Sequence, residues 1–374
     1  MSKIILIGSA HPYRGGLAAY NERLAEALQE AGHEVTIYTF TLQYPNFLFP
    51  GKTQFTTEAA SAKITIKRKV NSINPLNWII VGNEIKRLKP DILLIKYWLP
   101  FMGPCFGTIA RLAKKNRHTK VISILDNVVP HEKRVGDVAF TKYYIGSSDA
   151  FIGMSQTVLD DLKLFDNKKP SAFNPHPLFD NFGKPVPKEQ AKQLLGLDAG
   201  TNYMLFFGFI RDYKGLDLLL EAFADERLQK LKLKLIIAGE FYSDKKKYDD
   251  LIDNYNLKDR LVLKTDFIPD SEVFKYFCAA DIVVQPYKHA TQSGVTQIAY
   301  QFNKPMIVTN VGGLAEIVPD GKAGYVVEPS PTAIANAIFD FYSANKENFF
   351  IDGIKQIRPR FEWGAMVRTI EKLG

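Results

Sequence analysis

Two cations, Arg211 and Lys214, stand three positions apart and are well placed to bind an anion. They follow an apolar run at 204–207, which predicts a buried strand, and they precede Gly215 and a helical pattern. Fixed cations at a strand end could neutralise a diphosphate, including one that departs as a leaving group, without a metal ion. A solvated basic loop is the alternative, but the position between strand and glycine favours an anion site.

Further candidate anion sites lie where glycines separate a predicted strand from a predicted helix. Gly15 and Gly16 follow the first strand beside Arg14, so backbone N–H groups and a helix N-terminus could hold an anion there. A tight turn that needs glycine for purely structural reasons is an equally open interpretation. Similar signals in the second half are Gly208, Gly239, Glu240, Gln292, Ser293, Gly294 and Val295. Each signal is weak by itself, so their order along the chain carries more information.

Short β-branched runs alternate with helical patterns throughout, which predicts parallel sheets covered by helices on both faces. The expected strands are 4–7, 35–40, 64–66, 92–95, 121–125 and 151–153, then 204–207, 235–238, 261–263, 282–284, 306–309 and 325–327. In the second half, helices are expected at 216–223, 246–255, 272–279, 297–302 and 331–343. Closely spaced prolines from 175 to 187 predict a linker. The fold class is therefore α/β, with two Rossmann-like parallel-sheet domains facing across a cleft where ligands bind.

The composition excludes several classes of protein. The 374 residues are 46% apolar and 24% charged, as in soluble globular proteins, and they suffice for two or three domains. Cys105 and Cys278 are the two cysteines, and they can build neither a disulfide framework nor a zinc cluster. No apolar segment is long enough for an export signal or a spanning helix. We therefore expect a cytoplasmic protein that binds no metal.

The net charge of +8 is confined to the first half of the chain. Residues 1–180 hold 23 Lys and Arg against 15 Asp and Glu, whereas residues 181–374 hold 25 of each kind. The basic residues cluster at 63–69, 86–89 and 111–120, and Phe47, Phe49 and Phe55 flank a Pro-Gly loop. Basic clusters beside exposed apolar side chains are typical of proteins that bind anionic lipid surfaces. Peripheral membrane association is therefore one interpretation, and ordinary solvated lysines with buried phenylalanines are the other. With no recognition module in the sequence, we expect no nucleic-acid partner.

The order of the motifs resembles that of one enzyme family. The segment from Gly208 to Gly215 is followed by Ala-Gly-Glu-Phe at 238–241, Ala-Ala-Asp-Ile-Val-Val-Gln-Pro-Tyr at 279–287 and Thr-Gln-Ser-Gly-Val at 291–295. Asn-Lys-Pro-Met-Ile at 303–307 and Asn-Val-Gly-Gly-Leu-Ala-Glu at 310–316 come next. The chain thus resembles family 4 of the GT-B glycosyltransferases, also described as group 1, over nearly its whole length. The resemblance is most specific from 205 to 330.

The resemblance implies a retaining, metal-independent hexosyltransferase without a cofactor. Its donor would be a nucleotide diphosphate-sugar, UDP- or GDP-linked, held by the second domain. Its acceptor would be a glycan or a lipid-linked glycan bound by the first domain, as in the synthesis of bacterial surface polysaccharides or glycolipids. In this fold the last helix crosses back to the first domain, which gives an acceptor domain at 1–178 plus 358–374 and a donor domain at 185–357.

The resemblance also assigns roles to individual residues. Arg211 and Lys214 match the family's diphosphate-contacting cations, and Gly16 matches a first-domain glycine that approaches the phosphates. Ser293, Gly294 and Val295 match the loop whose amides meet the diphosphate or the sugar. Phe267 and Ile268 match the base-binding edge, while Glu240 and Glu316 stand in recognisable motifs without a defined role.

This chain departs from the family pattern in the donor loop. Many members carry two glutamates eight positions apart, the second of which binds the ribose hydroxyls, where this chain has Ala290 and Ile298. Neither side chain can accept a hydrogen bond. Gln292 and Gln297 lie one or two residues away and could substitute as neutral amides.

A second departure concerns the first domain. Many members have histidine at the end of the strand where this chain has Asp126, and His131 follows a few residues later. Both are candidate catalytic residues, because His131 in a loop that opens to the cleft could bond a sugar or acceptor hydroxyl. A surface histidine without a role and an aspartate that stabilises a turn are the alternatives.

Two other functions stay open beside the transferase. One is an epimerase or hydrolase of the same fold that acts on the nucleotide-sugar without an acceptor. The other is a catalytically silent subunit that retains the nucleotide-sugar site. The motif order favours the transferase, since the fold alone would not distinguish the three.

Overall fold

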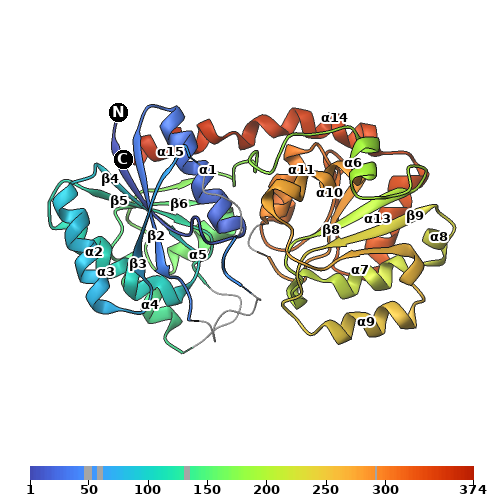
Figure 1. Cartoon of the computed structure of the whole chain (residues 1–374), viewed down its shortest axis with the longest axis horizontal. Helices are drawn as coiled ribbons and strands as arrows, with labels where there is room; N and C mark the ends of the chain where they lie inside the picture. The colour runs from blue at the N-terminus through green and yellow to red at the C-terminus, as the bar shows by residue number, and fades with distance from the viewer. Residues whose placement is uncertain (46–52, 57–61, 130–134, 291–292) are drawn as a thin grey trace. The chain divides into compact units, whose positions relative to one another are not determined.

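In the computed structural model the chain is described at residues 1–45, 53–56, 62–129, 135–290 and 293–374. It divides into two compact units, with Met1–Pro177 and Glu362–Gly374 forming unit 1 and Leu178–Phe361 forming unit 2. Each unit contains one sheet in which all paired strands are parallel, with helices packed on it (Figure 1). The predicted α/β class with two Rossmann-like domains is therefore confirmed.

Unit 1 has a seven-stranded sheet of order β3-β2-β1-β4-β5-β6-β7. Its strands are β1 (Lys3–Ile7), β2 (Glu34–Leu42), β3 (Thr65–Asn71), β4 (Ile92–Tyr97), β5 (Lys120–Leu125), β6 (Ala150–Gly153) and β7 (Ser171–Phe173). Its helices are α1 (Gly16–Glu30), α2 (Pro75–Leu88), α3 (Gly103–Lys114), α4 (Asp137–Ile145), α5 (Gln156–Lys163) and α15 (Trp363–Leu373), with a 3₁₀ turn η2 (Pro100–Met102). The strand order reverses between β1 and β4, which is where such sheets bind ligands at their carboxyl edge.

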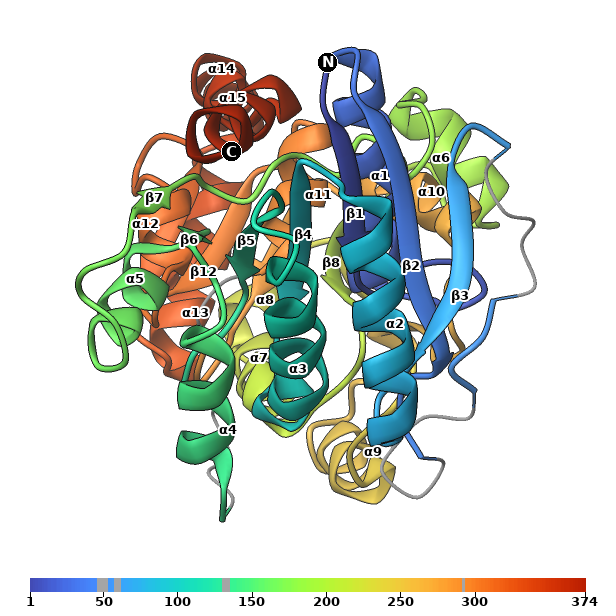
Figure 2. The same cartoon turned by 90° about the vertical axis from the view of Figure 1, so that its left-hand side faces the viewer.

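Apolar strands buried on both faces build the core of unit 1. All six residues of β4 are buried, as parallel strands covered by helices require. Helices α2, α3 and α4 lie side by side across one face of the sheet (Figure 2). Asn74 caps the N-terminus of α2, because its side chain accepts hydrogen bonds from the N–H groups of Leu76 and Asn77. Three residues separate the end of β3 from the start of this helix.

Helix α15 completes unit 1 by packing on α1. The ring centres of Trp363 in α15 and Tyr20 in α1 are 5.3 Å apart. The buried positions of α15 are spaced three and four residues apart, as an apolar helical stripe requires: Trp363, Met366, Val367 and Ile370. The expected return of the last helix to the first domain is thus confirmed.

Unit 2 has a six-stranded sheet of order β10-β9-β8-β11-β12-β13. Its strands are β8 (Asn202–Phe207), β9 (Leu233–Ala238), β10 (Leu261–Lys264), β11 (Ile282–Gln285), β12 (Met306–Thr309) and β13 (Gly324–Val327). Its helices are α6 (Lys188–Leu194), α7 (Leu216–Phe223), α8 (Glu226–Gln229), α9 (Lys245–Asn254), α10 (Val273–Ala279), α11 (Gly294–Gln301), α12 (Leu314–Ile317), α13 (Pro331–Ser343) and α14 (Glu347–Ile357). Short 3₁₀ turns are η3 (Asp212–Lys214), η4 (Lys258–Arg260), η5 (Asp270–Glu272) and η6 (Arg358–Phe361).

Every strand and helix expected from the sequence is present, with bounds that differ by a few residues. The structure adds elements for which no range was predicted from the sequence: α2, α3, α4, α5 and β7 in unit 1, and α6, α8, α12 and α14 in unit 2. The structure places the domain boundaries after Pro177 and after Phe361, where the sequence places them at 178–185 and 357–358.

Candidate functional site

The loop that follows β8 carries the two cations and is held by the segment that follows β9. The N–H of Gly208 donates to the carbonyl of Ala238 at 2.9 Å, and the N–H of Ile210 donates to the carbonyl of Glu240 at 2.8 Å. Ile210 also forms an isolated parallel bridge with Phe241. The backbone of this loop is therefore an extension of the sheet at its carboxyl edge.

Two glycines allow the backbone of this loop to lie in contact with the segments that follow β9 and β11. Gly239 has φ +144°, and a Cβ on it would lie 2.2 Å from the carbonyl oxygen of Gly208. Gly215 has φ +67°, and a Cβ there would lie 1.9 Å from the carbonyl oxygen of Pro286. Since both positions combine a left-handed backbone with a backbone contact, only glycine fits them without a shift. The loop is thus fixed between the ends of β9 and β11.

Lys214 is buried at the centre of this arrangement. Only 8% of it is exposed, and its Nζ lies 5.6 Å from the centre of the Tyr287 ring. A Cβ on Gly208 would lie 2.8 Å from that Nζ, so the ammonium group sits against the glycine backbone. Burial, together with the positive charge of Arg211, lowers the pKa of Lys214 to about 7. Within the described part of the chain, Lys214 forms no ion pair and no side-chain hydrogen bond.

Arg211 lies on an aromatic surface at the edge of the same loop. Its guanidinium is 5.3 Å from the ring centre of Tyr242, and the Phe209 ring stacks on Tyr242 at 4.4 Å. Phe209 in turn stacks on Phe267, with ring centres 6.4 Å apart. Among the described residues, Arg211 has no carboxylate partner either. Two adjacent cations without counter-charges are costly to keep together, and an anionic ligand would relieve that cost.

The N-terminus of α11 lies beside the buried lysine. A Cβ on Gly208 would come within 3.7 Å of Val295 Cγ2, and Val295 belongs to the first turn of α11. The side chain of Ser293, the N-cap residue, does not cap the helix, and its Oγ lies 3.2 Å from the hydroxyl of Tyr287. The N–H groups of a helix start favour a bound anion. The structure thus brings together Gly208, Lys214 and Val295 as expected.

The remaining predicted residues of unit 2 differ in how exposed they are. Phe267, Ile268 and Gly294 are partly exposed, and Glu240 is buried with 4% exposure. Gln297 is fully buried, and neither atom of its side-chain amide has a hydrogen-bond partner among the described residues. Ile298 is also buried, whereas Ala290 is partly exposed. Gln292 lies outside the described residues.

In unit 1 the predicted glycine turn lies directly before α1. Gly15 is the N-cap of α1 with φ 97° and ψ 178°, a conformation that side chains disfavour. A Cβ on Gly16 would meet no atom within 4 Å. A side chain at Gly16 would therefore meet no steric obstacle, so the ligand role expected for this glycine stays a prediction.

Asp126 follows β5 and forms a buried ion pair. One of its carboxylate oxygens lies 2.7 Å from Nζ of Lys96, which is 1% exposed. The same Nζ lies 3.6 Å from the ring centre of Tyr20, and that ring lies 4.9 Å from the ring of His176. Burial and the nearby charge of Lys96 lower the pKa of His176 to about 3, which keeps the imidazole neutral.

Sequence reasoning missed Lys96, although a lysine inside the apolar run of β4 was a usable signal. His131, the other catalytic candidate of unit 1, lies outside the described residues. Within the described ranges, no group of three or more His, Cys, Asp and Glu side chains is arranged to hold a metal ion. No helix in those ranges is both long and apolar enough to cross a bilayer.

Two parallel-sheet Rossmann-like units define the GT-B class, and solved structures share this fold. Sucrose-phosphate synthase from Thermosynechococcus elongatus matches with a TM-score of 0.75 and 20% identity, covering 100% of this chain and 98% of its own. Anabaena HepE in complex with UDP and glucose matches with a TM-score of 0.71 and 16% identity, covering 100% of this chain and 99% of its own. At these identities the likeness concerns the fold.

Sequence comparison gives the family. Residues 201–344 match the glycosyl transferases group 1, and residues 14–171 match glycosyltransferase family 4. The D-inositol 3-phosphate glycosyltransferase of Pseudarthrobacter chlorophenolicus is 25% identical over 342 residues, covering 84% of this chain and 78% of that protein. An uncharacterized glycosyltransferase of Methanocaldococcus jannaschii is 23% identical over 377 residues, covering 99% of this chain and 97% of that protein. The chain is a group 1 glycosyltransferase of GT-B fold, as the motif order predicts.

Proposed function

We propose that this glycosyltransferase is a retaining, metal-independent hexosyltransferase that takes its sugar from a nucleotide diphosphate-sugar bound by unit 2. The unpaired cations Arg211 and Lys214, beside the N-terminus of α11, carry this proposal. A diphosphate supplies the counter-charge that this loop lacks. Anabaena HepE, which shares the fold, has been solved in complex with UDP and with UDP-glucose. This supports a UDP-sugar as the donor.

The two cations act mainly on the departing diphosphate. Negative charge on the β-phosphate grows as the glycosidic bond breaks, so fixed cations stabilise the transition state more than the bound donor. Loss of one such group costs on the order of a hundred- to a thousandfold in kcat. Arg211→Ala and Lys214→Ala should each show that loss, whereas Lys230→Ala, which removes an exposed lysine of unit 2, should not. Near-normal turnover of either site variant, or strict dependence on added divalent metal, would contradict the assignment.

A donor screen tests the reaction class. Release of nucleoside diphosphate from UDP- and GDP-sugars is measured with and without glycan or lipid-linked acceptors. Release that depends on the acceptor supports transfer, and retention is read from the anomeric configuration of the product. Isomerisation or hydrolysis without acceptor would favour an epimerase or hydrolase, and tight donor binding without turnover would favour a silent subunit.

We propose further that unit 1 binds a lipid-linked acceptor at an anionic membrane surface. Helix α2 supports this, because Leu76 and Ile80 on its outer face are 71% and 63% exposed, and Lys86 and Arg87 occupy its last turn. Of the aromatic residues that suggested a membrane loop, Phe55 packs on Tyr13 at 5.2 Å and stays 46% exposed. Phe47 and Phe49 lie outside the described residues.

Sedimentation with vesicles of graded anionic lipid content, at low and high salt, tests the surface. Binding should rise with anionic lipid and fall with salt. Leu76→Ser with Ile80→Ser should weaken binding, whereas Phe349→Ser, which changes an exposed apolar residue of unit 2, should not. If the same fraction of the protein stays in the supernatant under every condition, the protein does not bind the membrane, and its acceptor is soluble.

A further inference from the structure

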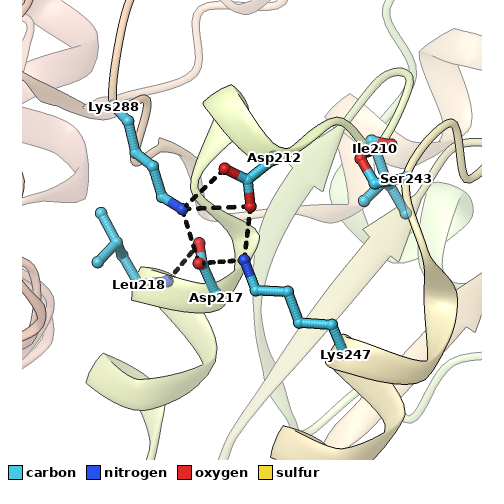
Figure 3. Close-up of polar contacts among 7 residues, drawn as sticks. All are labelled: Ile210, Asp212, Asp217, Leu218, Ser243, Lys247 and Lys288. Atoms are coloured by element: carbon cyan, nitrogen blue, oxygen red, sulfur yellow. Dashed lines mark hydrogen bonds and ion pairs between the residues drawn. The ribbon is translucent and has the colours of Figure 1, made fainter.

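Four charged side chains around the loop that follows β8 form a network of ion pairs, which Figure 3 shows. Asp212 begins η3, Asp217 lies in the first turn of α7, Lys247 lies in α9, and Lys288 follows β11. Lys247 and Lys288 each contact both carboxylates. We call these four residues the Asp–Lys network.

Asp217 is the fixed centre of the network. Its Oδ2 lies 2.7 Å from Nζ of Lys247 and 2.7 Å from Nζ of Lys288. Its Oδ1 accepts a hydrogen bond from the N–H of Leu218 at 3.1 Å. With 18% of its side chain exposed, it is the least exposed of the four side chains. These contacts lower the pKa of Asp217, so the carboxylate stays charged and holds both lysines in place.

Asp212 is the residue whose position needs explaining. In the sequence it lies between Arg211 and the segment that leads to Lys214, so its carboxylate is a nearby counter-ion for either cation. Instead it contacts Lys247 and lies 3.3 Å from Lys288 (Figure 3). Within the described residues, Asp212 pairs with neither Arg211 nor Lys214.

Lys288 also fixes the loop through its backbone. Its N–H donates to the carbonyl of Tyr213 at 2.7 Å, in the middle of η3. One residue therefore anchors the loop backbone and holds the Asp212 carboxylate. Lys288 directly follows Tyr287, whose ring faces Lys214, so this anchor lies next to the cation site.

We propose that the Asp–Lys network is a positioning device that keeps the Asp212 carboxylate away from Arg211 and Lys214, so that both cations stay available to a diphosphate. The inference rests on the proposed function of those two cations. Without the two lysines, the freed carboxylate would pair with Arg211 or Lys214 and repel the ligand. None of the four network residues touches the substrate in this scheme.

A double-mutant cycle tests the proposal with UDP, GDP and inorganic pyrophosphate as probes. Lys247→Met with Lys288→Met should weaken binding of the diphosphate about tenfold or more, a loss of about 1.4 kcal/mol. Asp212→Asn alone should change affinity less than threefold. Asp212→Asn added to the two lysine changes should recover most of the affinity, because it removes the competing carboxylate.

Two controls separate this role from a structural one. Lys245→Met with Asp249→Asn removes an ion pair of the same helix, 3.3 Å long, and should leave binding unchanged. Melting temperatures of all variants are measured in parallel, and a merely structural network would make affinity follow stability. The positioning role predicts that Asp212→Asn restores binding without restoring the melting temperature.

The outcomes distinguish this inference from the proposed function. Diphosphate binding by the wild type, with effects of the lysine and aspartate changes that simply add, would overturn the positioning role alone. A lysine double variant that binds like the wild type would do the same. If the wild type binds none of the three probes, both the proposed function and the inference are wrong.

Discussion

Binding of a nucleoside diphosphate should be coupled to uptake of a proton by Lys214. Burial beside Arg211 lowers the pKa of this lysine to about 7, so above that pH its side chain is mostly the neutral amine in the free protein. A diphosphate next to Nζ supplies negative charge and returns the pKa toward its ordinary value. The lysine must therefore bind a proton when the ligand binds.

The size of this uptake follows from the titration of one group. At pH 8 about 0.09 of the free protein carries the proton, so binding takes up about 0.9 proton. At pH 7 the uptake is about 0.5 proton, and at pH 6 it is about 0.1. The ligand's own terminal phosphate titrates near pH 6, so measurements at pH 8 report mainly the protein.

Isothermal titration calorimetry measures the uptake directly. The observed enthalpy of UDP or GDP binding at pH 8 is plotted against the ionisation enthalpy of several buffers, and the slope is the number of protons exchanged. The wild type should give a slope near 0.9 proton, and Lys214→Met should give a slope near zero. A wild-type slope below about 0.2 would refute the reasoning, as would an unchanged slope in the variant.

The same lysine makes a prediction for stability. Its pKa is lower in the folded than in the unfolded state, so the unfolded state binds more protons between about pH 7 and pH 10. The free energy of unfolding should therefore rise with pH across that window. Lys214→Met should stabilise unit 2 most below pH 7, by on the order of 5 kcal/mol at most, and the gain should vanish near pH 10. A pH-independent effect in thermal melts would contradict this assignment.

Three further substitutions test features of the two units. Asp126→Ala leaves Lys96 buried without its carboxylate and should destabilise unit 1 by about 3–5 kcal/mol in chemical denaturation; adding Lys96→Met should recover most of the loss, and no recovery would point to another role for Asp126. Gly239→Ala places a Cβ against the carbonyl of Gly208 and should lower the melting temperature of unit 2. A variant that melts at the wild-type temperature would contradict the backbone conformation described for Gly239. Gly16→Val meets open space and should keep the melting temperature but abolish transfer, and retained transfer per folded molecule would mean that the turn is purely structural.

The fold could be predicted where the local pattern was strong. Strands such as β1 and β4 are continuous apolar runs, and α7 combines an apolar stripe with a glycine start. Strand β7 was missed because its three residues, Ser171 to Phe173, alternate exposed and partly buried positions and lie at the sheet edge. A strand of that length is defined by its neighbour β6 rather than by its own side chains.

In the candidate site, too, residues close together in the sequence could be predicted, whereas contacts between residues far apart in the sequence could not. Arg211 and Lys214 could be found because a strand end, two cations and a glycine lie within eight residues of one another. Lys288 could not be found, because its partner Asp217 is 71 positions away and the contact exists only after three strand ends meet. The ion pair of Asp126 with Lys96 also joins two strands, and no pattern within either strand specifies its partner.

The packing of α15 on α1 has a consequence for the order in which the protein is made. Because α15 follows all of unit 2 in the sequence, the ribosome synthesises residues 178–361 while Tyr20 of unit 1 still lacks its contact with Trp363. At ordinary rates of synthesis this interval lasts about 10–40 s, which is long compared with the folding of a single domain. Unit 1 must therefore wait, with one apolar edge uncovered, until a complete second domain has emerged. The nascent chain spends this time as a folded or folding unit 2 attached to an incomplete unit 1, and that species is the one a ribosome-associated chaperone would meet.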